Sequence, residues 1–318
     1  MASQKSTIDR IRAVEAPGIP GPAGVRRALQ LLERLSPALG GYLAERMWFR
    51  RPPVPPATRR ARRTPGGGEP FRVAWSGGTV AGRAYGVAGA PTAYLVHGWG
   101  GWWQQLGAHV EPLLAAGMQV VAFDAPSHGE SGPGRFGRHS TTLIEFAEAL
   151  AAVVAEFGHP AAVIAHSAGA VGVLHAYDRG VQADAYALVA PPDSMAPMMR
   201  RFCSVLGVGP RSGRRMLERA ERRIGLPLER FDMVRMARTL PAHPPLLVVH
   251  DRHDPETPAT GSVALAAAWP GADLLLTEGL GHRRLLWEGT VVERVAGFVA
   301  ATRRTRPTAA PEVSRSSR

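Results

Sequence analysis

From residue 71 onward, short apolar runs alternate with segments of helical periodicity, and this alternation limits the possible folds more than any other feature. The apolar runs cover residues 93–96, 120–123, 162–165, 186–190, 246–249 and 272–277; the helical segments cover 103–116, 142–157, 170–177 and 291–302. Short β-rich runs separated by helices are typical of a mostly parallel, doubly wound sheet with right-handed crossovers. We therefore expect an α/β fold, preceded by a hairpin of residues 71–76 and 79–85 that turns at Gly77-Gly78.

The distribution of charge divides the 318 residues into blocks. The formal net charge is +12. Residues 1–70 hold 13 basic and 5 acidic side chains, residues 191–244 hold 11 and 5, and residues 303–318 hold 5 and 1. The blocks 71–190 and 245–302 are mildly acidic. We interpret 1–70 as an N-terminal helical arm with a basic linker, 71–190 and 245–302 as two parts of one α/β core, 191–244 as a helical cap insertion, and 303–318 as a basic disordered tail.

Leucines at helical spacing between residues 25 and 49 predict two short amphipathic helices in the arm, with breaks near Ser36-Pro37 and Gly40-Gly41. The helices end in Trp48, Phe49 and several arginines. We expect either a helical arm packed on the core or, alternatively, a peripheral membrane contact through these aromatic and basic side chains.

Composition narrows the remaining classes. The sequence has no apolar stretch of membrane-spanning length and no signal-peptide pattern, which predicts a cytoplasmic protein. The single cysteine, Cys203, cannot form an intramolecular disulfide. Almost all of the basic residues are arginine, and the sequence contains no asparagine. A GC-rich gene would produce this composition. The positive charge is therefore weak evidence for a nucleic-acid partner. We expect no nucleic acid, and the oligomeric state stays open.

Chemically useful residues follow the expected strands. In parallel sheets, ligands bind beyond the carboxyl ends of the strands. His166, Ser167 and two small residues follow the strand that ends at Ala165, in a pattern close to G-x-S-x-G, with Ala165 in place of the first glycine. Alone, this pentapeptide is equally consistent with a chance junction. However, Asp254 and His282 follow two later strands, and together the three supply a nucleophile, an orienting acid and a base.

A glycine-rich turn follows the strand at 93–96. The sequence His97-Gly98-Trp99-Gly100-Gly101 leaves backbone N–H groups unobstructed. It matches neither of the glycine patterns of phosphate-binding loops, G-x-x-x-x-G-K-[ST] and G-x-G-x-x-G. We expect the N–H groups of Trp99 and Ala168 to form an oxyanion hole.

These stretches, together with residues 123–131, resemble the α/β-hydrolase superfamily over roughly residues 71–302. The resemblance implies an α/β-hydrolase fold with Ser167 as nucleophile, Asp254 as acid, His282 as base, and Trp99 and Ala168 as oxyanion donors. Asp251 is a second carboxylate that could replace Asp254; the following proline favours Asp254. Asp124 and His128 are expected to hold loop geometry.

Other side chains near the expected site suggest a pocket. Trp102, Trp103 and His166 lie beside the two loops, and Met198 belongs to the methionine-rich insertion, so we expect these four to bind substrate. His250, Asp251, His253 and Asp254 could suggest a metal cluster, but side chains so close to a strand end diverge, and we expect no metal and no cofactor.

We therefore expect a serine hydrolase that cleaves a small-molecule carboxylic ester or thioester through an acyl-enzyme. Peptidase, lactonase or carbon–carbon bond hydrolase activity stays open. The alternative from another class is a non-catalytic binding protein with the same fold.

Overall fold

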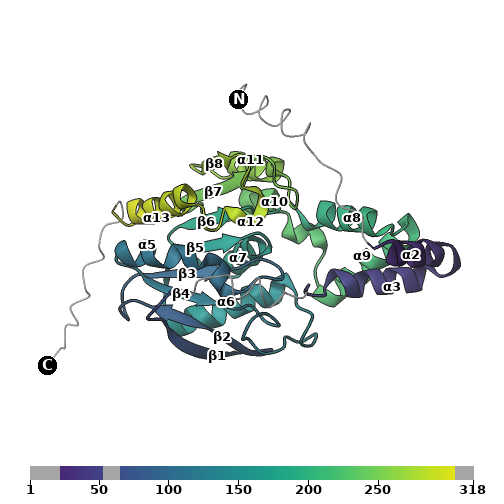
Figure 1. The fold of residues 1–318 in the computed structure, drawn as a ribbon, viewed down its shortest axis with the longest axis horizontal. Coiled ribbons are helices and arrows are strands. Elements are labelled where there is room, and N and C mark those ends of the chain that lie inside the picture. Colours follow the sequence, from purple (N-terminus) through teal and green to yellow (C-terminus); the bar gives the residue numbers. More distant parts are fainter. Residues whose placement is uncertain (1–21, 53–64, 305–318) are drawn as a thin grey trace, which may run out of the picture.

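The computed structural model describes residues 22–52 and 65–304, and within them one eight-stranded sheet forms the centre of the molecule (Figure 1). The strand order is β1-β2-β4-β3-β5-β6-β7-β8. The bounds are β1 Glu69–Trp75, β2 Gly78–Tyr85, β3 Thr92–Val96, β4 Gln119–Phe123, β5 Pro160–His166, β6 Tyr186–Val189, β7 Leu246–Asp251 and β8 Asp273–Thr277. β1 and β2 are antiparallel to their neighbours, and all pairs from β4 to β8 are parallel. The predicted mostly parallel, doubly wound sheet is confirmed.

Helices cover both faces of the sheet because its central strands are apolar on both sides. Tyr94 and Val96 of β3 face one core, which α6 Leu143–Phe157, α7 Ala168–Asp178 and α11 Ala259–Ala268 cover. Ala93 and Leu95 face a second core under η1 Trp103–His109, α5 Val110–Ala115 and α13 Gly289–Arg304. Alternate residues of one strand thus serve opposite faces, which explains why these strands have continuous apolar sequences.

The hairpin turns one residue earlier than expected. Trp75 pairs with Gly78, so Ser76 and Gly77 form the two-residue turn and Gly78 already belongs to β2. The expected helix over residues 103–116 is also two pieces, η1 and α5, which meet at His109 and Val110.

The insertion at residues 191–244 forms helices between β6 and β7. These are α8 Met195–Leu206, α9 Pro210–Ile224, η2 Leu228–Phe231 and α10 Met233–Thr239. The arm folds as α2 Ala23–Leu35 and α3 Pro37–Trp48, which lie beside α8 and α9 at one end of the molecule (Figure 1). The arm therefore packs mainly on the insertion and not on the sheet.

The helix break predicted at Ser36-Pro37 is present, but the prediction of a second helix break at Gly40-Gly41 is wrong. Ser36 caps α3 by accepting a hydrogen bond from Leu39, and the helix continues through both glycines. The glycines are needed for close packing, since a Cβ on Gly41 would lie 2.8 Å from the carbonyl oxygen of Ser212 in α9. Gly40 and Gly41, which the sequence suggested as a helix break, therefore allow close contact between α3 and α9.

Two glutamates of the arm anchor it to α9. The Glu33 carboxylate accepts hydrogen bonds from the N–H groups of Arg211 (3.0 Å) and Ser212 (2.9 Å), in the first turn of α9. Burial acts to raise the pKa of Glu33, but the hydrogen bonds from Ser212 and Arg211 outweigh it and lower the pKa to about 2. Glu45 is almost fully buried and forms an ion pair with Arg223. The arm thus supplies the carboxylates that the arginine-rich helix needs.

The expected basic linker falls mostly on residues 53–64 and the expected tail mostly beyond residue 304, outside the described residues. α13 extends to Arg304, so the tail boundary expected at 303 falls inside a helix. Within the described residues, we find no helix with both the length and the apolarity that crossing a bilayer requires.

The α3–α9 contact leads to a stability prediction. Gly41→Ala should lower the free energy of unfolding by about 1–3 kcal/mol, because the new methyl group meets the backbone of α9. Gly24→Ala in α2 is the matched control: a Cβ there meets nothing within 4 Å, and alanine favours a helix. Urea unfolding of both variants measures the difference. Equal stability of Gly41→Ala and the unmodified chain would contradict the role given to Gly41.

Candidate active site

Ser167 occupies a strained turn between a buried strand and a buried helix. It follows β5, precedes α7, and has φ 51° and ψ −126°. Positive φ is uncommon for serine and is a mark of functional turns. Gly169 permits the turn, because a Cβ there would lie 2.4 Å from the carbonyl oxygen of His97. Ala165, the departure from the expected glycine, is fully buried in β5 and paired with Val96 and Leu188.

His282 lies between Ser167 and Asp254. Its Nε2 is 3.0 Å from the Ser167 Oγ, and its Nδ1 is 2.7 Å from Oδ2 of Asp254. Asp254 follows β7, and His282 lies on the short helix α12 Gly281–Arg284 after β8. The carboxylate can only accept, so Nδ1–H donates to Asp254, and Nε2 is left to accept the hydroxyl proton of Ser167. The structure thus brings the three expected residues into one hydrogen-bonded chain.

Several donors surround the carboxylate of Asp254, which is completely shielded from solvent. The N–H groups of Glu256 (2.7 Å) and Thr257 (3.0 Å) and the Thr257 hydroxyl (3.0 Å) donate to it, and Nε2 of His250 lies 3.2 Å away. Burial acts to raise the pKa of Asp254, but the hydrogen bonds from His250 and His282 outweigh it and lower the pKa well below its usual value. Asp254 is therefore ionised at neutral pH.

Asp251 is directed to other partners. Its Oδ1 accepts a hydrogen bond from the His253 N–H (3.0 Å), and its Oδ2 accepts from the Thr277 hydroxyl and the Leu280 N–H, both at 2.9 Å. Burial acts to raise the pKa of Asp251, and these hydrogen bonds overcome it and lower the pKa. Asp251 therefore braces the loop that precedes His282, while Asp254 contacts His282 directly.

The glycine-rich turn after β3 lies against the serine. A Cβ on Gly98 would lie 2.9 Å from Nδ1 of His166 and 3.0 Å from the Cβ of Ser167, so a larger residue would push the turn away from the serine. Trp99 follows Gly98 in the turn, and Ala168 is the first residue of α7, where a helix leaves backbone N–H groups without intrahelical partners. Both expected oxyanion donors thus belong to segments that flank Ser167.

Two buried histidines hold this turn in place. Nε2 of His97 accepts from the Ala125 N–H (2.9 Å), and Nε2 of His128 accepts from the Gly100 N–H (3.0 Å). Burial lowers the pKa of His97 to about 4 and the pKa of His128 well below its usual value. Both rings are therefore neutral at pH 7, as an accepting nitrogen requires. Asp124 accepts from the N–H groups of Trp103 (2.8 Å) and Glu130 (2.7 Å), in agreement with its expected role in loop geometry.

His166 contacts the backbone of the loop that carries His282. Its Nε2 donates to the carbonyl oxygen of His282 at 3.0 Å, so its Nδ1 carries no proton. Burial and the neighbouring His282 lower the pKa of His166 well below its usual value. Nδ1 is buried beside Gly98 and has no hydrogen-bond partner among the described residues.

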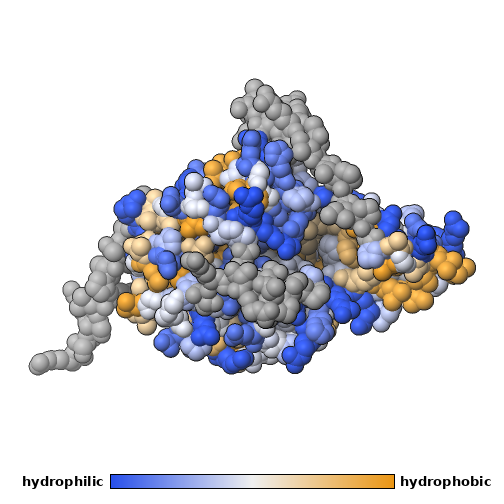
Figure 2. All heavy atoms as spheres, in the orientation of Figure 1, coloured by the Kyte–Doolittle hydropathy of each residue, from blue (hydrophilic) through white to orange (hydrophobic). Residues whose placement is uncertain are grey.

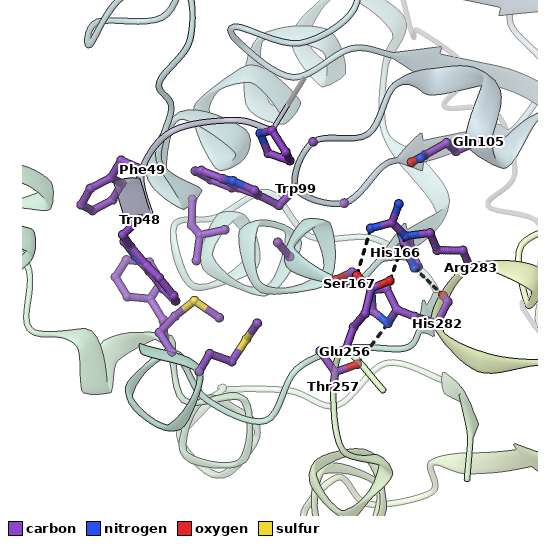
Figure 3. Close-up of a pocket in the computed structure, with 18 of the residues that line it drawn as sticks. Trp48, Phe49, Trp99, Gln105, His166, Ser167, Glu256, Thr257, His282 and Arg283 are labelled. Carbon is purple, nitrogen blue, oxygen red and sulfur yellow. Dashed lines mark hydrogen bonds and ion pairs between the residues drawn. The ribbon is translucent and has the colours of Figure 1, made fainter. Parts of the chain in front are cut away.

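A largely apolar pocket of about 630 Å³ opens at Ser167 (Figure 3). Its wall combines Trp99 and Trp102 from the turn after β3, Met195, Met198 and Phe231 from the insertion, and Trp48 and Phe49 from the arm. In Figure 3, Trp48 and Phe49 lie across the pocket from His282 and Thr257. Glu256 and Arg283 pair at the opposite side through two hydrogen bonds of 2.9 and 3.0 Å.

Three of the four expected substrate contacts line this pocket: Trp102, His166 and Met198. Trp103 does not; it is buried in the core of the other sheet face, beside Tyr85. Since η1 begins at Trp103, this side chain turns into the protein while the preceding Trp102 faces the pocket. The expectation for Trp103 is therefore wrong.

The sequence alone did not reveal the pocket role of Trp48 and Phe49, nor the support that His250 and Thr257 give to Asp254. The arm lies more than 100 residues from Ser167, and no local pattern links them. For Thr257 a signal was available in Asp254 itself, since an aspartate side chain commonly accepts hydrogen bonds from backbone N–H groups two or three residues later.

Side chains that could bind a metal do not gather in the described ranges, where no group of three His, Cys, Asp or Glu has a suitable arrangement. Cys203 is half-buried in α8 with its sulfur 3.7 Å from that of Met216, and burial raises the pKa of its thiol. Cys203 therefore packs as a thiol and lies outside the pocket lining.

Comparison with known proteins places this geometry in a family. The sequence matches the alpha/beta hydrolase family over residues 93–300. No curated protein matches the chain significantly. Solved structures with a similar fold include an esterase from Rhodococcus sp. ECU1013, at 19% sequence identity and a TM-score of 0.55, covering 74% of this chain and 99% of that one. An esterase from Pyrococcus furiosus has 19% sequence identity and a TM-score of 0.56, covering 74% of this chain and 92% of that one. A carboxylesterase from Bacillus subtilis has 16% sequence identity and a TM-score of 0.55, covering 83% of this chain and 99% of that one.

The matched range contains β4 to β8 and all of β3 except its first residue. It also contains the turn of Trp99, the turn of Ser167, and the loops of Asp254 and His282. It covers more than half of the sequence and begins after the arm and the β1–β2 hairpin. The chain therefore belongs to the alpha/beta hydrolase family.

Proposed function

We propose that this protein is a serine hydrolase that cleaves carboxylic esters or thioesters through an acyl-enzyme intermediate. The single observation that carries the proposal is the hydrogen-bonded chain from the Ser167 Oγ through His282 to the buried carboxylate of Asp254, with distances of 3.0 and 2.7 Å. A serine hydroxyl is a weak nucleophile unless such a base removes its proton.

In the first step, Oγ of Ser167 attacks the carbonyl carbon of the substrate while Nε2 of His282 takes the hydroxyl proton. The carbonyl oxygen becomes negatively charged in the tetrahedral intermediate. The N–H groups of Trp99 and Ala168 donate hydrogen bonds to this oxygen, and in a water-poor pocket such donors stabilise the charge strongly.

In the second step, the bond to the alcohol or thiol breaks and His282 returns the proton to this leaving group. A water molecule then gives a proton to His282 and attacks the acyl carbon. The bond to Ser167 breaks, His282 returns the proton to Oγ of Ser167, and the carboxylic acid is released. Asp254 stays ionised throughout. It orients the ring of His282 and stabilises the imidazolium that forms in each step.

The pocket supports an apolar acyl or leaving group. Its wall is built of indole, phenyl and thioether side chains, and the polar atoms gather near Ser167 and the pair of Glu256 and Arg283. We propose that the insertion at residues 191–244 acts as a cap over this pocket, and that the arm completes the cap through Trp48 and Phe49.

Replacement of the nucleophile tests the chemistry. Ser167→Ala should lower kcat by on the order of 10⁴-fold or more across a panel of chromogenic esters and thioesters of graded acyl length. A fluorophosphonate probe should label the unmodified protein and not the variant. Labelling of neither protein, or undiminished turnover by folded Ser167→Ala, would overturn the proposal.

The two buried carboxylates should behave differently. Asp254→Asn removes the acceptor of the His282 Nδ1 proton, so kcat should fall by about 10⁴-fold with the fold retained. Asp251→Asn disturbs hydrogen bonds to Thr277 and Leu280, so it should lower stability more than it lowers the kcat of the folded fraction. Thermal unfolding together with ester turnover separates the two effects. Loss of turnover in folded Asp251→Asn alone would show that the wrong carboxylate is assigned.

The arm should influence acyl selectivity. Trp48 lies across the pocket from His282, so Trp48→Ala should reduce kcat/KM for long-chain esters by about tenfold relative to acetyl esters, through lost apolar contact. Trp48→Phe should restore most of the preference. Equal reductions for all chain lengths would show that the acyl chain does not reach Trp48.

A further inference from the structure

The exposed apolar side chains of this protein are concentrated at the arm. Among the described residues, large hydrophobic side chains are exposed at seven positions, and only Val87 lies away from the arm and its surroundings. The other six are Leu31, Leu35, Leu39, Leu43, Phe136 and Leu217. Leu35, at the end of α2, is 73% exposed. Figure 2 shows apolar surface gathered over the end of the molecule that α2 and α3 form.

The leucines of α3 form one stripe. Leu39 and Leu43 are four residues apart and so lie on the same side of the helix, while the buried Gly40, Gly41 and Ala44 face α9. Leu31 and Leu35 repeat this spacing on α2. The two adjacent helices thus place four exposed leucines at this end of the molecule, which is more than scattered surface residues produce.

A basic cavity continues this stripe. It has a volume of about 490 Å³, and Leu43 and Phe136 contribute apolar surface to it. Four arginines line it, namely Arg46, Arg50, Arg138 and Arg223, and no acidic side chain is among its lining residues. Glu45 is buried behind the cavity and pairs with Arg223. A cavity with this charge and these apolar edges is suited to an anionic group attached to an apolar chain.

α3 separates this cavity from the catalytic pocket. Trp48 and Phe49 line the catalytic pocket, whereas Arg46, Met47 and Arg50 line the basic cavity. The guanidinium group of Arg223 stacks between the rings of Phe49 and Phe136, at 5.0 and 4.8 Å from their centroids. The two aromatic residues expected to reach a membrane thus face the substrate, and the leucines and arginines face outward.

We propose that the outer face, meaning Leu31, Leu35, Leu39 and Leu43 together with the arginine-lined cavity, docks on a lipid surface that carries anionic headgroups. The leucines enter the boundary between headgroups and acyl chains, as the apolar face of an interfacial helix does. The arginines bind the phosphate groups, and each basic side chain near such a surface strengthens binding about fivefold.

The leucine stripe favours a lipid surface over a nucleic acid. Phosphate contacts to nucleic acid need cations and hydrogen-bond donors, and four exposed leucines supply neither. A lipid surface matches both parts of the outer face. Docking there also places the wall of the catalytic pocket next to the source of apolar substrates.

Vesicle flotation with the full chain tests the proposal. The protein should float with vesicles of phosphatidylcholine mixed with phosphatidylglycerol, and much less with phosphatidylcholine alone. Arg46→Gln combined with Arg138→Gln should weaken binding about 25-fold, at roughly fivefold per arginine. Leu35→Ser combined with Leu39→Ser should weaken it at least tenfold, since the apolar contribution is lost.

Matched controls lie elsewhere on the surface. Val87→Ser removes the exposed apolar residue distant from the arm, and Arg238→Gln removes an exposed cation of α10; neither should change flotation. Unchanged thermal unfolding of all variants excludes misfolding as the cause. The proposal is overturned if the protein does not float with anionic vesicles, or if the control variants lose as much vesicle binding as the double variants. It is overturned as well if both double variants float as the unmodified protein does. It is also overturned if the leucine variants abolish a dimer in sedimentation while vesicles bind nothing, or if only free inorganic phosphate binds.

Discussion

The parallel register of the central strands is the constraint on which the site depends. β3, β5, β7 and β8 all end at one edge of the sheet, so the turn of Trp99, the elbow of Ser167, and the loops of Asp254 and His282 meet there. Each segment contributes one group, and none of them could act alone. A shift in the register of one strand would separate Ser167 from His282, although neither residue had changed.

Buried polar side chains hold these loop segments at the distances that the chemistry needs. His97 and His128 hold the turn of Trp99, His166 holds the backbone of His282, and Asp251 braces the loop before it. The three histidines are neutral because burial lowers their pKa values. A neutral ring can accept a hydrogen bond at one nitrogen and donate at the other, so these side chains position loops without adding positive charge beside the base.

The sequence predicted the sheet, and it singled out the three residues that hydrogen bonds join in the structure, because both leave local signals. Apolar runs mark buried strands, and a residue placed directly after a strand can be assigned to a sheet edge without knowing the rest of the fold. The preference for Asp254 over Asp251 agrees with the hydrogen bond to His282. Contacts between distant segments left no such signal. Gly40 and Gly41 indicated a helix break, yet in the structure they allow α3 to approach α9. Trp102 and Trp103 could not be distinguished in the sequence, but η1 begins at Trp103 and directs this side chain into the core.

The arm changes how the positive charge of the chain is interpreted. Part of the arginine excess in α9 is neutralised from the arm, because Glu33 pairs with Arg211 and Glu45 pairs with Arg223. Arg46, Arg50 and Arg138 face the outer cavity. The same short helix that uses glycines to pack and Trp48 to line the pocket at Ser167 thus presents leucines and cations to the outside. Because α3 has these separate faces, a contact on the outer one can act on the pocket through α3 itself or through Arg223, which stacks on Phe49 of the pocket wall.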